Sequence, residues 1–276
     1  AGSGLLKFRE QYPDRINDVG IAEQTAVTMS AGYAVSGVDV FTPIYSTFIQ
    51  RAYDQVNHDV ARQNLKVVFG IDRAGIVGAD GETHQGVFDI PLLRHIPNIT
   101  ITHPRTAIEA FELLNYAFKK QDGPFVIRYT RGSTICDFNH PVTKNYASLT
   151  WDTIHEGTKA TFISFGKILD EMREVAVKEK LDIEIINAKI IKPLDYQVIE
   201  RVLSGNKPVI IYEESALLGG FGSSILEYAV ANHLPTSNIH LMGIKDEFVQ
   251  HCDKISILKE YNLDVKSIIK TIKEHI

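Results

Sequence analysis

The sequence is poor in cysteine. Only two cysteines, Cys136 and Cys252, stand among its 276 residues. They are far apart in the chain and form neither a Cys-x-x-Cys pair nor the cysteine and histidine spacing of a zinc site. This excludes a disulfide framework and predicts two reduced thiols in a cytoplasmic protein.

Long hydrophobic runs and basic clusters are also missing. No apolar run approaches the roughly 20 residues of a transmembrane helix, and the first residues do not resemble a signal peptide. The formal net charge is −5, and lysine and arginine are nowhere dense. A basic surface for nucleic acid or an anionic membrane is therefore not expected. We expect a soluble, cytoplasmic protein with no nucleic-acid or membrane partner.

The remaining composition is that of an ordinary globular protein. Apolar residues make up 44% of the chain and charged residues 23%. The length suits two domains of ordinary size. The chain begins without methionine and soon enters a helical pattern, so we expect it to be a fragment of a longer protein.

Strand-like and helix-like segments alternate along the chain. In the first half the pattern predicts strands at 15–20, 38–45, 66–72, 99–102 and 125–129, and helices at 21–36, 46–63 and 106–121. In the second half it predicts strands at 160–165, 183–188, 208–212 and 240–243, and helices at 168–181, 194–203, 222–232, 255–261 and 265–276. This alternation indicates an α/β fold, with mostly parallel sheets flanked by helices. We predict two domains, 1–132 and 158–276, and a linker at 133–157 where the alternation stops.

One loop after a predicted buried strand is rich in reactive side chains. The segment DRAGIVGADGETHQG, residues 72–86, contains four glycines together with Arg73, Asp80 and His84. Glycines let a backbone approach a ligand closely, although a plain turn can contain them too. In parallel sheets, ligands bind beyond the carboxyl ends of the strands. Three ionisable groups of different type at such a place favour proton transfer and anion binding over a plain turn.

Three further loops carry candidates that each have a structural alternative. Glu23 stands near the start of a predicted helix, where a carboxylate can simply complement the helix dipole. Tyr45 and Phe48 follow a strand, but on their own they fit core aromatics. Arg131 leaves the last strand of the first half and, alone, fits a surface ion pair.

Taken together, these segments resemble the 1-deoxy-D-xylulose 5-phosphate synthase family. The motifs DVGIAEQ, YSTFIQRAYDQVNHDVA, DRAGIVGADGETHQGVFDIPLLRHIPN and RYTRG occur in the family's order. INAKIIKPLD, EESALLGGFGSSILE and MGIKDEFVQH extend the resemblance over nearly the whole chain. It implies a transketolase-like pyrimidine-binding domain followed by a transketolase C-terminal domain. Thr25 and Thr130 depart from the family's usual His and Pro, at positions that concern packing more than chemistry.

The resemblance implies a transketolase-type transferase with thiamine diphosphate and Mg²⁺ as cofactors. The family decarboxylates pyruvate and joins the product to D-glyceraldehyde 3-phosphate, the first step of non-mevalonate isoprenoid synthesis. The family's N-terminal domain binds the diphosphate and Mg²⁺ through a GDG-type motif. No such motif occurs here, and GADG at 78–81 is not one, so we expect this chain alone to be inactive.

The resemblance also assigns roles to the candidate residues. Glu23 would bond to N1′ of the cofactor's pyrimidine and favour its imino tautomer. Phe48 would stack on that ring, and Tyr45 would close the same pocket. The other four residues would act on the acceptor, D-glyceraldehyde 3-phosphate. Arg73 and Arg131 would bind its phosphate, and Asp80 and His84 would position its hydroxyls and transfer protons.

Other assignments stay open. Arg51 fits either a role near the aromatics or an ion pair across a subunit contact. Gly219-Gly220-Phe221-Gly222 looks like a phosphate loop, but a tight turn before a helix is the better interpretation, and the second half would serve homodimer contact. The alternatives to the synthase are the β subunit of a 2-oxo acid dehydrogenase, a split transketolase, and a non-catalytic partner subunit. The first two would need other sequences in place of residues 72–86.

Overall fold

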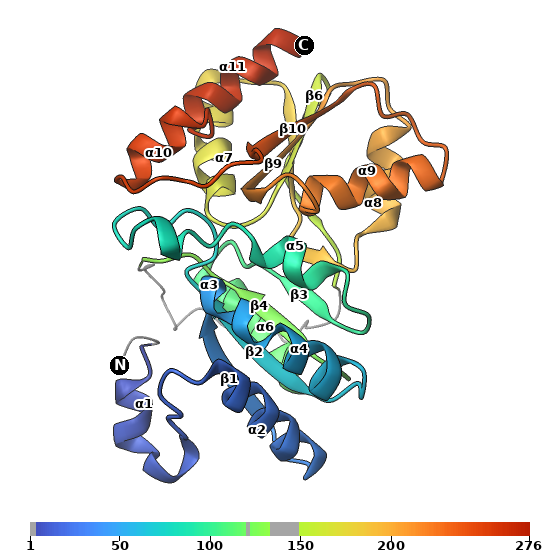
Figure 1. Cartoon of the computed structure of the whole chain (residues 1–276). Coiled ribbons are helices and arrows are strands. Elements are labelled where there is room, and N and C mark those ends of the chain that lie inside the picture. The colour runs from blue at the N-terminus through green and yellow to red at the C-terminus, as the bar shows by residue number, and fades with distance from the viewer. Residues whose placement is uncertain (1–3, 120–121, 133–148) are drawn as a thin grey trace.

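The computed structural model describes residues 4–119, 122–132 and 149–276. Within them the chain forms two five-stranded sheets, each mostly parallel and flanked by helices (Figure 1). The predicted α/β fold with two such sheets is confirmed.

The first sheet has the strand order β1-β2-β4-β3-β8. Its strands are β1 (Val40–Tyr45), β2 (Val67–Asp72), β3 (Thr100–Thr102), β4 (Phe125–Arg128) and β8 (Ile190–Lys192). The first four pair in parallel, and β8 pairs antiparallel to β3. Strand β8 belongs to the second half of the chain and was not predicted.

The helices around this sheet only partly match the predicted ones. They are α1 (Leu6–Gln11), α2 (Glu23–Val35), α3 (Ser46–Ile49), α4 (Tyr53–Gln55), α5 (Asp89–Arg94) and α6 (Ala107–Lys119), with 3₁₀ turns at Pro13–Arg15, Gln50–Ala52 and Glu82–His84 and a π-helical turn at Val56–Ala61. The single helix predicted at 46–63 is thus divided into four short segments, two α-helical, one 3₁₀ and one π-helical. The strand predicted at 15–20 is wrong: these residues are largely exposed, and their few apolar side chains do not bury a strand.

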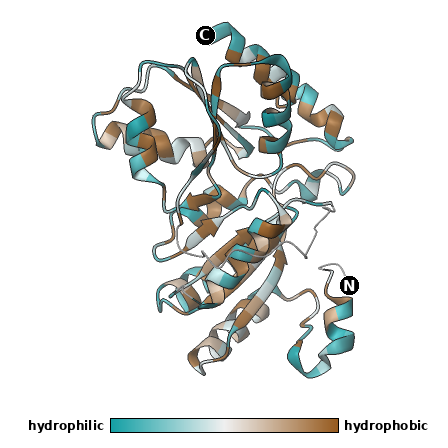
Figure 2. Ribbon diagram, turned by 180° about the vertical axis from the view of Figure 1, so that it is seen from behind, coloured by the Kyte–Doolittle hydropathy of each residue, from teal (hydrophilic) through white to brown (hydrophobic). Residues whose placement is uncertain are grey.

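The second sheet has the strand order β10-β9-β6-β7-β5. Its strands are β5 (Asp152–His155), β6 (Ala160–Ser164), β7 (Ile183–Asn187), β9 (Val209–Ala216) and β10 (Ile239–Ile244). Its helices are α7 (Ile168–Glu179), α8 (Tyr196–Leu203), α9 (Phe221–Ala231), α10 (Lys254–Glu260) and α11 (Val265–His275). Figure 2 shows brown and teal alternating along α11, whose Ile268, Ile269 and Ile272 are buried.

Strand β5 lies inside the segment predicted as a linker. It pairs antiparallel to β7, so the carboxyl end of that segment belongs to the second sheet. Residues 133–148 of the linker lie outside the described residues. The division into domains at these boundaries stays a prediction.

The two halves share a core and several polar contacts. One apolar cluster contains residues of both sheets, including Ile101 of β3, Ile163 of β6 and Ile211 of β9. Asn187 Nδ2 donates to Glu109 Oε1 at 2.8 Å, and Arg94 Nη1 donates to Glu227 Oε2 at 3.0 Å across the same boundary. The shared core and these contacts hold the loops of the first half against the second.

Two further findings concern the described part of the chain. None of its helices has both the length and the apolar character needed to cross a bilayer. Within the same residues, no group of three or more His, Cys, Asp or Glu side chains is arranged to hold a metal ion. Cys252 is a free thiol, whereas Cys136 lies outside the described residues.

Candidate functional site

Three of the candidate loops begin side by side at the carboxyl edge of the first sheet. In the parallel register Tyr45 of β1 is opposite Asp72 of β2, and Ile71 of β2 is opposite Arg128 of β4. The residues that follow these strands are therefore delivered to one edge, where ligands of parallel sheets bind.

Glu23 is the first residue of α2 and is buried, with 9% of its surface exposed. Among the described residues its carboxylate has no hydrogen-bond donor, and its nearest charged partner is Arg51, whose Nη1 lies 3.7 Å from Oε2. The side chain of Glu23 is 11% exposed, so its carboxylate remains available to a ligand that donates a hydrogen bond. Arg51, whose role the sequence left open, pairs with Glu23 of its own chain.

The two predicted aromatics lie against each other. The rings of Tyr45 and Phe48 are stacked, with centroids 5.2 Å apart and planes inclined by 19°. The His84 ring meets Phe48 edge-on at 5.3 Å, and the guanidinium carbon of Arg51 lies 5.7 Å from the Phe48 centroid. Phe48 therefore contacts Arg51, the partner of Glu23, on one side and His84 of the 72–86 loop on the other.

Asp80 holds the two predicted arginines together. Its Oδ2 accepts from Arg73 Nε at 2.8 Å, and its Oδ1 lies 3.2 Å from Arg131 Nε. The Arg73 guanidinium also lies over the Tyr45 ring, 3.9 Å from its centroid. One carboxylate thus pairs with two guanidinium groups, and the other N–H groups of these arginines can bind an anion.

Asp72 is a site residue that the sequence did not single out. Arg73 has a φ of 60°, in the left-handed region that few side chains adopt. Asp72 supports it twice: its Oδ1 accepts from Arg73 N at 2.7 Å and its Oδ2 from Arg73 Nη1 at 2.8 Å. Burial raises the pKa of Asp72 although Arg73 acts to lower it. Its place at the end of a buried strand, beside an arginine, was the signal in the sequence.

The 72–86 loop is closed at its base by glycines. Gly75 and Gly86 exchange two backbone hydrogen bonds, of 2.7 and 2.8 Å. A Cβ at Gly86 would lie 2.0 Å from the carbonyl oxygen of Arg73, so a larger residue there would push the arginine out of place. Glycine is needed here for close backbone approach.

All seven predicted residues thus belong to one connected set of contacts. Glu23 reaches Phe48 through Arg51, Phe48 touches Tyr45 and His84, and the Arg73 guanidinium over Tyr45 continues to Asp80 and Arg131. The structure brings them together, and their chemical roles stay predictions.

Behind this site, Arg128 anchors the end of β4 through a buried ion pair. Its Nε and Nη2 donate to Asp89 at 2.6 and 2.9 Å, and its Nη1 lies 3.0 Å from His103 Nδ1. Arginine only donates, so His103 accepts at Nδ1 and is neutral. Burial, followed by the charge of Arg128, lowers the pKa of His103 well below its usual range. The loop that carries Arg131 therefore leaves a fixed strand end.

The glycine-rich turn before α9 is not an open phosphate site. The buried carboxylate of Glu213 accepts hydrogen bonds from Phe221 N at 2.8 Å and Gly222 N at 2.9 Å. A Cβ on Gly220 would lie 2.5 Å from Glu213 Oε2. Burial raises the pKa of Glu213 to about 7. The chain's own carboxylate takes the place of an anion, which confirms the structural interpretation of this turn.

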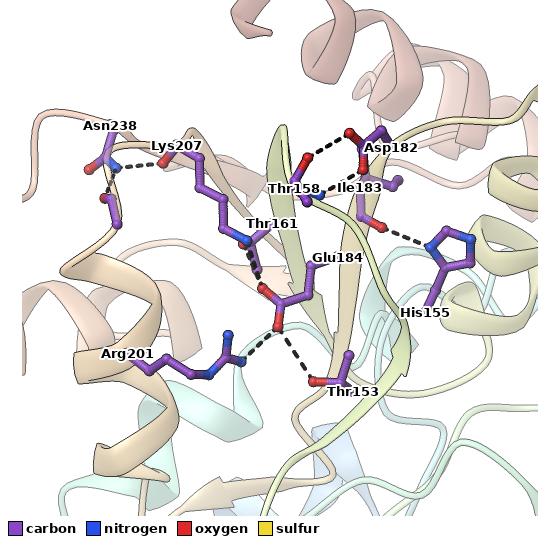
Figure 3. Close-up of polar contacts among 11 residues, drawn as sticks. Thr153, His155, Thr158, Thr161, Asp182, Ile183, Glu184, Arg201, Lys207 and Asn238 are labelled. Carbon is purple, nitrogen blue, oxygen red and sulfur yellow. Dashed lines mark hydrogen bonds and ion pairs between the residues drawn. The ribbon is translucent and has the colours of Figure 1, made fainter.

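A second charged cluster lies in the second sheet, around the buried Glu184 (Figure 3). Arg201 Nη2 donates to Glu184 Oε1 at 2.7 Å, and Lys207 Nζ donates to Oε2 at 3.0 Å. Thr161 Oγ1 also donates to Oε2, at 3.0 Å. Since side chains of this chain already use both oxygens, the cluster ties β7 to β6, to α8 and to the loop before β9.

Comparison with known proteins agrees with this architecture. Residues 1–135 match the family model of the transketolase pyrimidine binding domain, and residues 149–268 match that of the transketolase C-terminal domain. The chain therefore belongs to the transketolase family and consists of these two domains.

The curated relatives are more specific. The 1-deoxy-D-xylulose-5-phosphate synthase of Macrococcus caseolyticus is 45% identical over 280 residues, which cover 99% of this chain and 44% of the relative. That of Bacillus cereus strain B4264 is 43% identical over 274 residues, 98% of this chain and 44% of the relative. The chain thus spans less than half the length of these relatives. The resemblance that the motifs predict is confirmed.

A solved structure supports the fold. A split gene transketolase, described as an inactive β4 tetramer, superposes with a TM-score of 0.84 over 100% of this chain and 89% of its own. At 21% identity this likeness concerns the fold alone.

Proposed function

We propose that this chain supplies the pyrimidine-binding and C-terminal domains of a 1-deoxy-D-xylulose 5-phosphate synthase. The reaction is decarboxylation of pyruvate and joining of the remaining two carbons to D-glyceraldehyde 3-phosphate. The observation that carries the proposal is the bridge of Asp80 between Arg73 and Arg131, which adjoins the aromatic pair next to Glu23. The identity of 45% to a synthase of that name supports it.

The residues around Glu23 fit the aminopyrimidine of thiamine diphosphate. A buried carboxylate without a donor suits a ring nitrogen that carries a proton, and the Tyr45–Phe48 pair offers an aromatic surface beside it. When bound, this cofactor supplies a carbon nucleophile that adds to the keto group of pyruvate. Glu23 would hold the proton at N1′, and Phe48 and Tyr45 would orient the ring and exclude water. The diphosphate and Mg²⁺ would be held by the part of the relatives' length that this chain does not span.

The arginine pair fits the phosphate of the acceptor. Arg73 and Arg131 approach Asp80 from two loops, and their remaining N–H groups can bind phosphate oxygens with the forked geometry of guanidinium groups. His84 touches Phe48, so it would lie close to both the cofactor's ring and the acceptor. Asp80 and His84 would position the acceptor's hydroxyls and move a proton to the new alkoxide.

A homodimer in the cytoplasm remains part of the proposal. Exposed apolar side chains on both halves, including Phe88, Leu218 and Phe248, offer contact surface in addition to that used within the chain.

The proposal is tested by comparing two proteins. One is the 276-residue chain, and the other is a protein of the relatives' full length that contains it. With thiamine diphosphate, Mg²⁺, pyruvate and D-glyceraldehyde 3-phosphate, the longer protein should form 1-deoxy-D-xylulose 5-phosphate and CO₂, and the chain alone should form neither. Turnover by the longer protein only with a ketose phosphate as donor would indicate a transketolase. Release of CO₂ from a 2-oxo acid with transfer to a lipoyl carrier would indicate a dehydrogenase subunit.

A further inference from the structure

The 72–86 loop is anchored in the second half of the chain. Ile76 and Val87, near its two ends, are buried in an apolar cluster otherwise formed by the second sheet and its helices, such as Phe162, Ile210 and Tyr212. Val87 also accepts a backbone hydrogen bond from Ala216, the last residue of β9, at 2.8 Å. A loop that starts on the first sheet therefore completes the core of the second.

Glu214 of β9 forms the polar part of this anchor. Its Oε2 accepts a hydrogen bond from the backbone N–H of Ile76 at 3.2 Å and one from Lys254 Nζ at 2.7 Å. The side chain of Glu214 is only 17% exposed and that of Lys254 37% exposed, so water screens the pair incompletely. A carboxylate that accepts from a backbone N–H forms a strong, directed hydrogen bond.

Glycines bring the backbone into reach of these two residues. Gly75, with a φ of +85°, lies so close that a Cβ would meet Glu214 Oε2 at 3.0 Å. Gly78, with a φ of +64°, would place a Cβ 2.7 Å from the backbone nitrogen of Lys254. Residues 74–78 and 85–87 are buried, whereas the tip that carries Asp80 and His84 is partly exposed. The tip is thus free for a ligand and fixed on both sides.

We propose that Glu214, held in place by Lys254, is a positioning residue of the acceptor site. It touches none of the predicted site residues. By fixing the Ile76 amide it sets the path of the loop, and with it the directions of Arg73 and Asp80. This inference rests on the proposed function for its kinetic consequence, but the anchoring itself can be measured without turnover.

The anchoring is tested by hydrogen exchange on the 276-residue chain. Glu214→Ala should increase the exchange rate of backbone amides in 74–87 by about 10-fold or more, because an amide bonded to a carboxylate loses its acceptor. Glu214→Gln keeps an oxygen that can accept from the Ile76 amide, so it should increase this exchange rate less. Lys254→Met removes the charge of a partly exposed side chain and keeps most of its length, so the fold should be preserved and the exchange rate should also rise. Glu227→Gln is the matched control, because it removes an interdomain carboxylate that pairs with Arg94 away from the loop.

The kinetic test uses the longer protein with the same variants. Glu214→Ala and Lys254→Met should raise KM for D-glyceraldehyde 3-phosphate by about 10-fold, since small misplacements of binding groups are costly, while KM for pyruvate stays unchanged. Lys254→Arg should restore the parent value. Unchanged exchange in 74–87 overturns the inference, and so does raised exchange with an unchanged acceptor KM. Failure of the proposed function is distinguished by a parent protein that forms no product, whatever the exchange results.

Discussion

Asp80 Oδ1 lies 3.2 Å from Arg131 Nε, although Asp80 stands in the loop after β2 and Arg131 follows β4. The other oxygen of the same carboxylate pairs with Arg73, so the two arginines are oriented by one acid. In the free site Asp80 also offsets the repulsion between the guanidinium groups. Binding of the acceptor phosphate should therefore depend on the three residues as a unit.

The first prediction concerns this unit. In the longer protein, Asp80→Ala and Arg131→Ala should each lower kcat/KM for D-glyceraldehyde 3-phosphate, and the double variant should lose less than the sum of the two. Residues in direct contact typically show coupling of about 0.5–3 kcal/mol. As a control, a second double-mutant cycle combines Asp80→Ala with Arg62→Ala. Arg62 is an exposed arginine, so this pair should show no coupling. Additive losses for Asp80 and Arg131 would mean that they bind independently.

The second prediction concerns Glu23. Glu23→Gln should lower turnover of the longer protein by about 10²- to 10⁴-fold, the range over which a positioned acid or base acts. The variant should keep its fold, because Glu23 accepts no hydrogen bond from the described residues. Glu10→Gln, on the exposed α1, should change neither turnover nor the circular dichroism melt. A Glu23 variant with most of the parent activity would show that another group is the partner of N1′.

The third prediction concerns stability and pH. Burial raises the pKa of Glu184, but the hydrogen bonds from Arg201 and Lys207 outweigh burial and lower it overall. Because the folded pKa lies below the ordinary value of 4.5, the stabilisation is complete above that value and is lost as the pH falls through the folded pKa. Glu184→Gln should cost about 2 kcal/mol at pH 7, since two cations lose their buried partner.

Urea unfolding at several pH values checks this. The parent and the Glu184→Gln variant should differ at pH 7 and converge only when the pH falls below the folded pKa of Glu184, where the carboxyl of the parent is protonated too. Glu174→Gln, an exposed acid on α7, should match the parent throughout. If the difference in free energy of unfolding between the two proteins persists at low pH, packing and not charge explains the lower stability of the variant.

Most of the fold could be predicted from the sequence, because long helices and strands show a clear periodicity of apolar residues. Strands such as β2 are apolar throughout, and α6 repeats its apolar residues at helical spacing, so both were predicted within a residue or two at most ends. Strand β8 was missed because its position is set by pairing with β3 from the other half of the chain. Helix α5 was missed because Pro91 stands within it. Proline is tolerated there because the first turn does not use its N–H.

The sequence predicted which residues form the candidate cluster, but not the contacts between them. Glu23, the aromatics, the arginines, Asp80 and His84 were found by their place after strands and by family resemblance. The pairing of Arg51 with Glu23 and the support of Arg73 by Asp72 depend on side-chain directions that a sequence does not specify. The anchor at Glu214 joins residues 138 positions apart, so no local pattern indicates it.

The last prediction tests the assignment of the arginines to the acceptor phosphate and not to the keto acid. In the longer protein, Arg131→Ala should raise KM for D-glyceraldehyde 3-phosphate and have much less effect with unphosphorylated glyceraldehyde. A hydrogen bond to a charged group is worth about 1.5–3 kcal/mol, so kcat/KM should fall roughly 10- to 150-fold. Arg131→Lys should recover only part of this, because an ammonium keeps the charge but loses the forked geometry. The side chain of Arg131 is half-exposed, so its removal should not disturb folding. A folding defect would also lower activity with both aldehydes and not with one alone. If the variant loses equally on both aldehydes, or chiefly in KM for pyruvate, Arg131 does not bind the acceptor phosphate, and its pairing with Asp80 is only a surface ion pair.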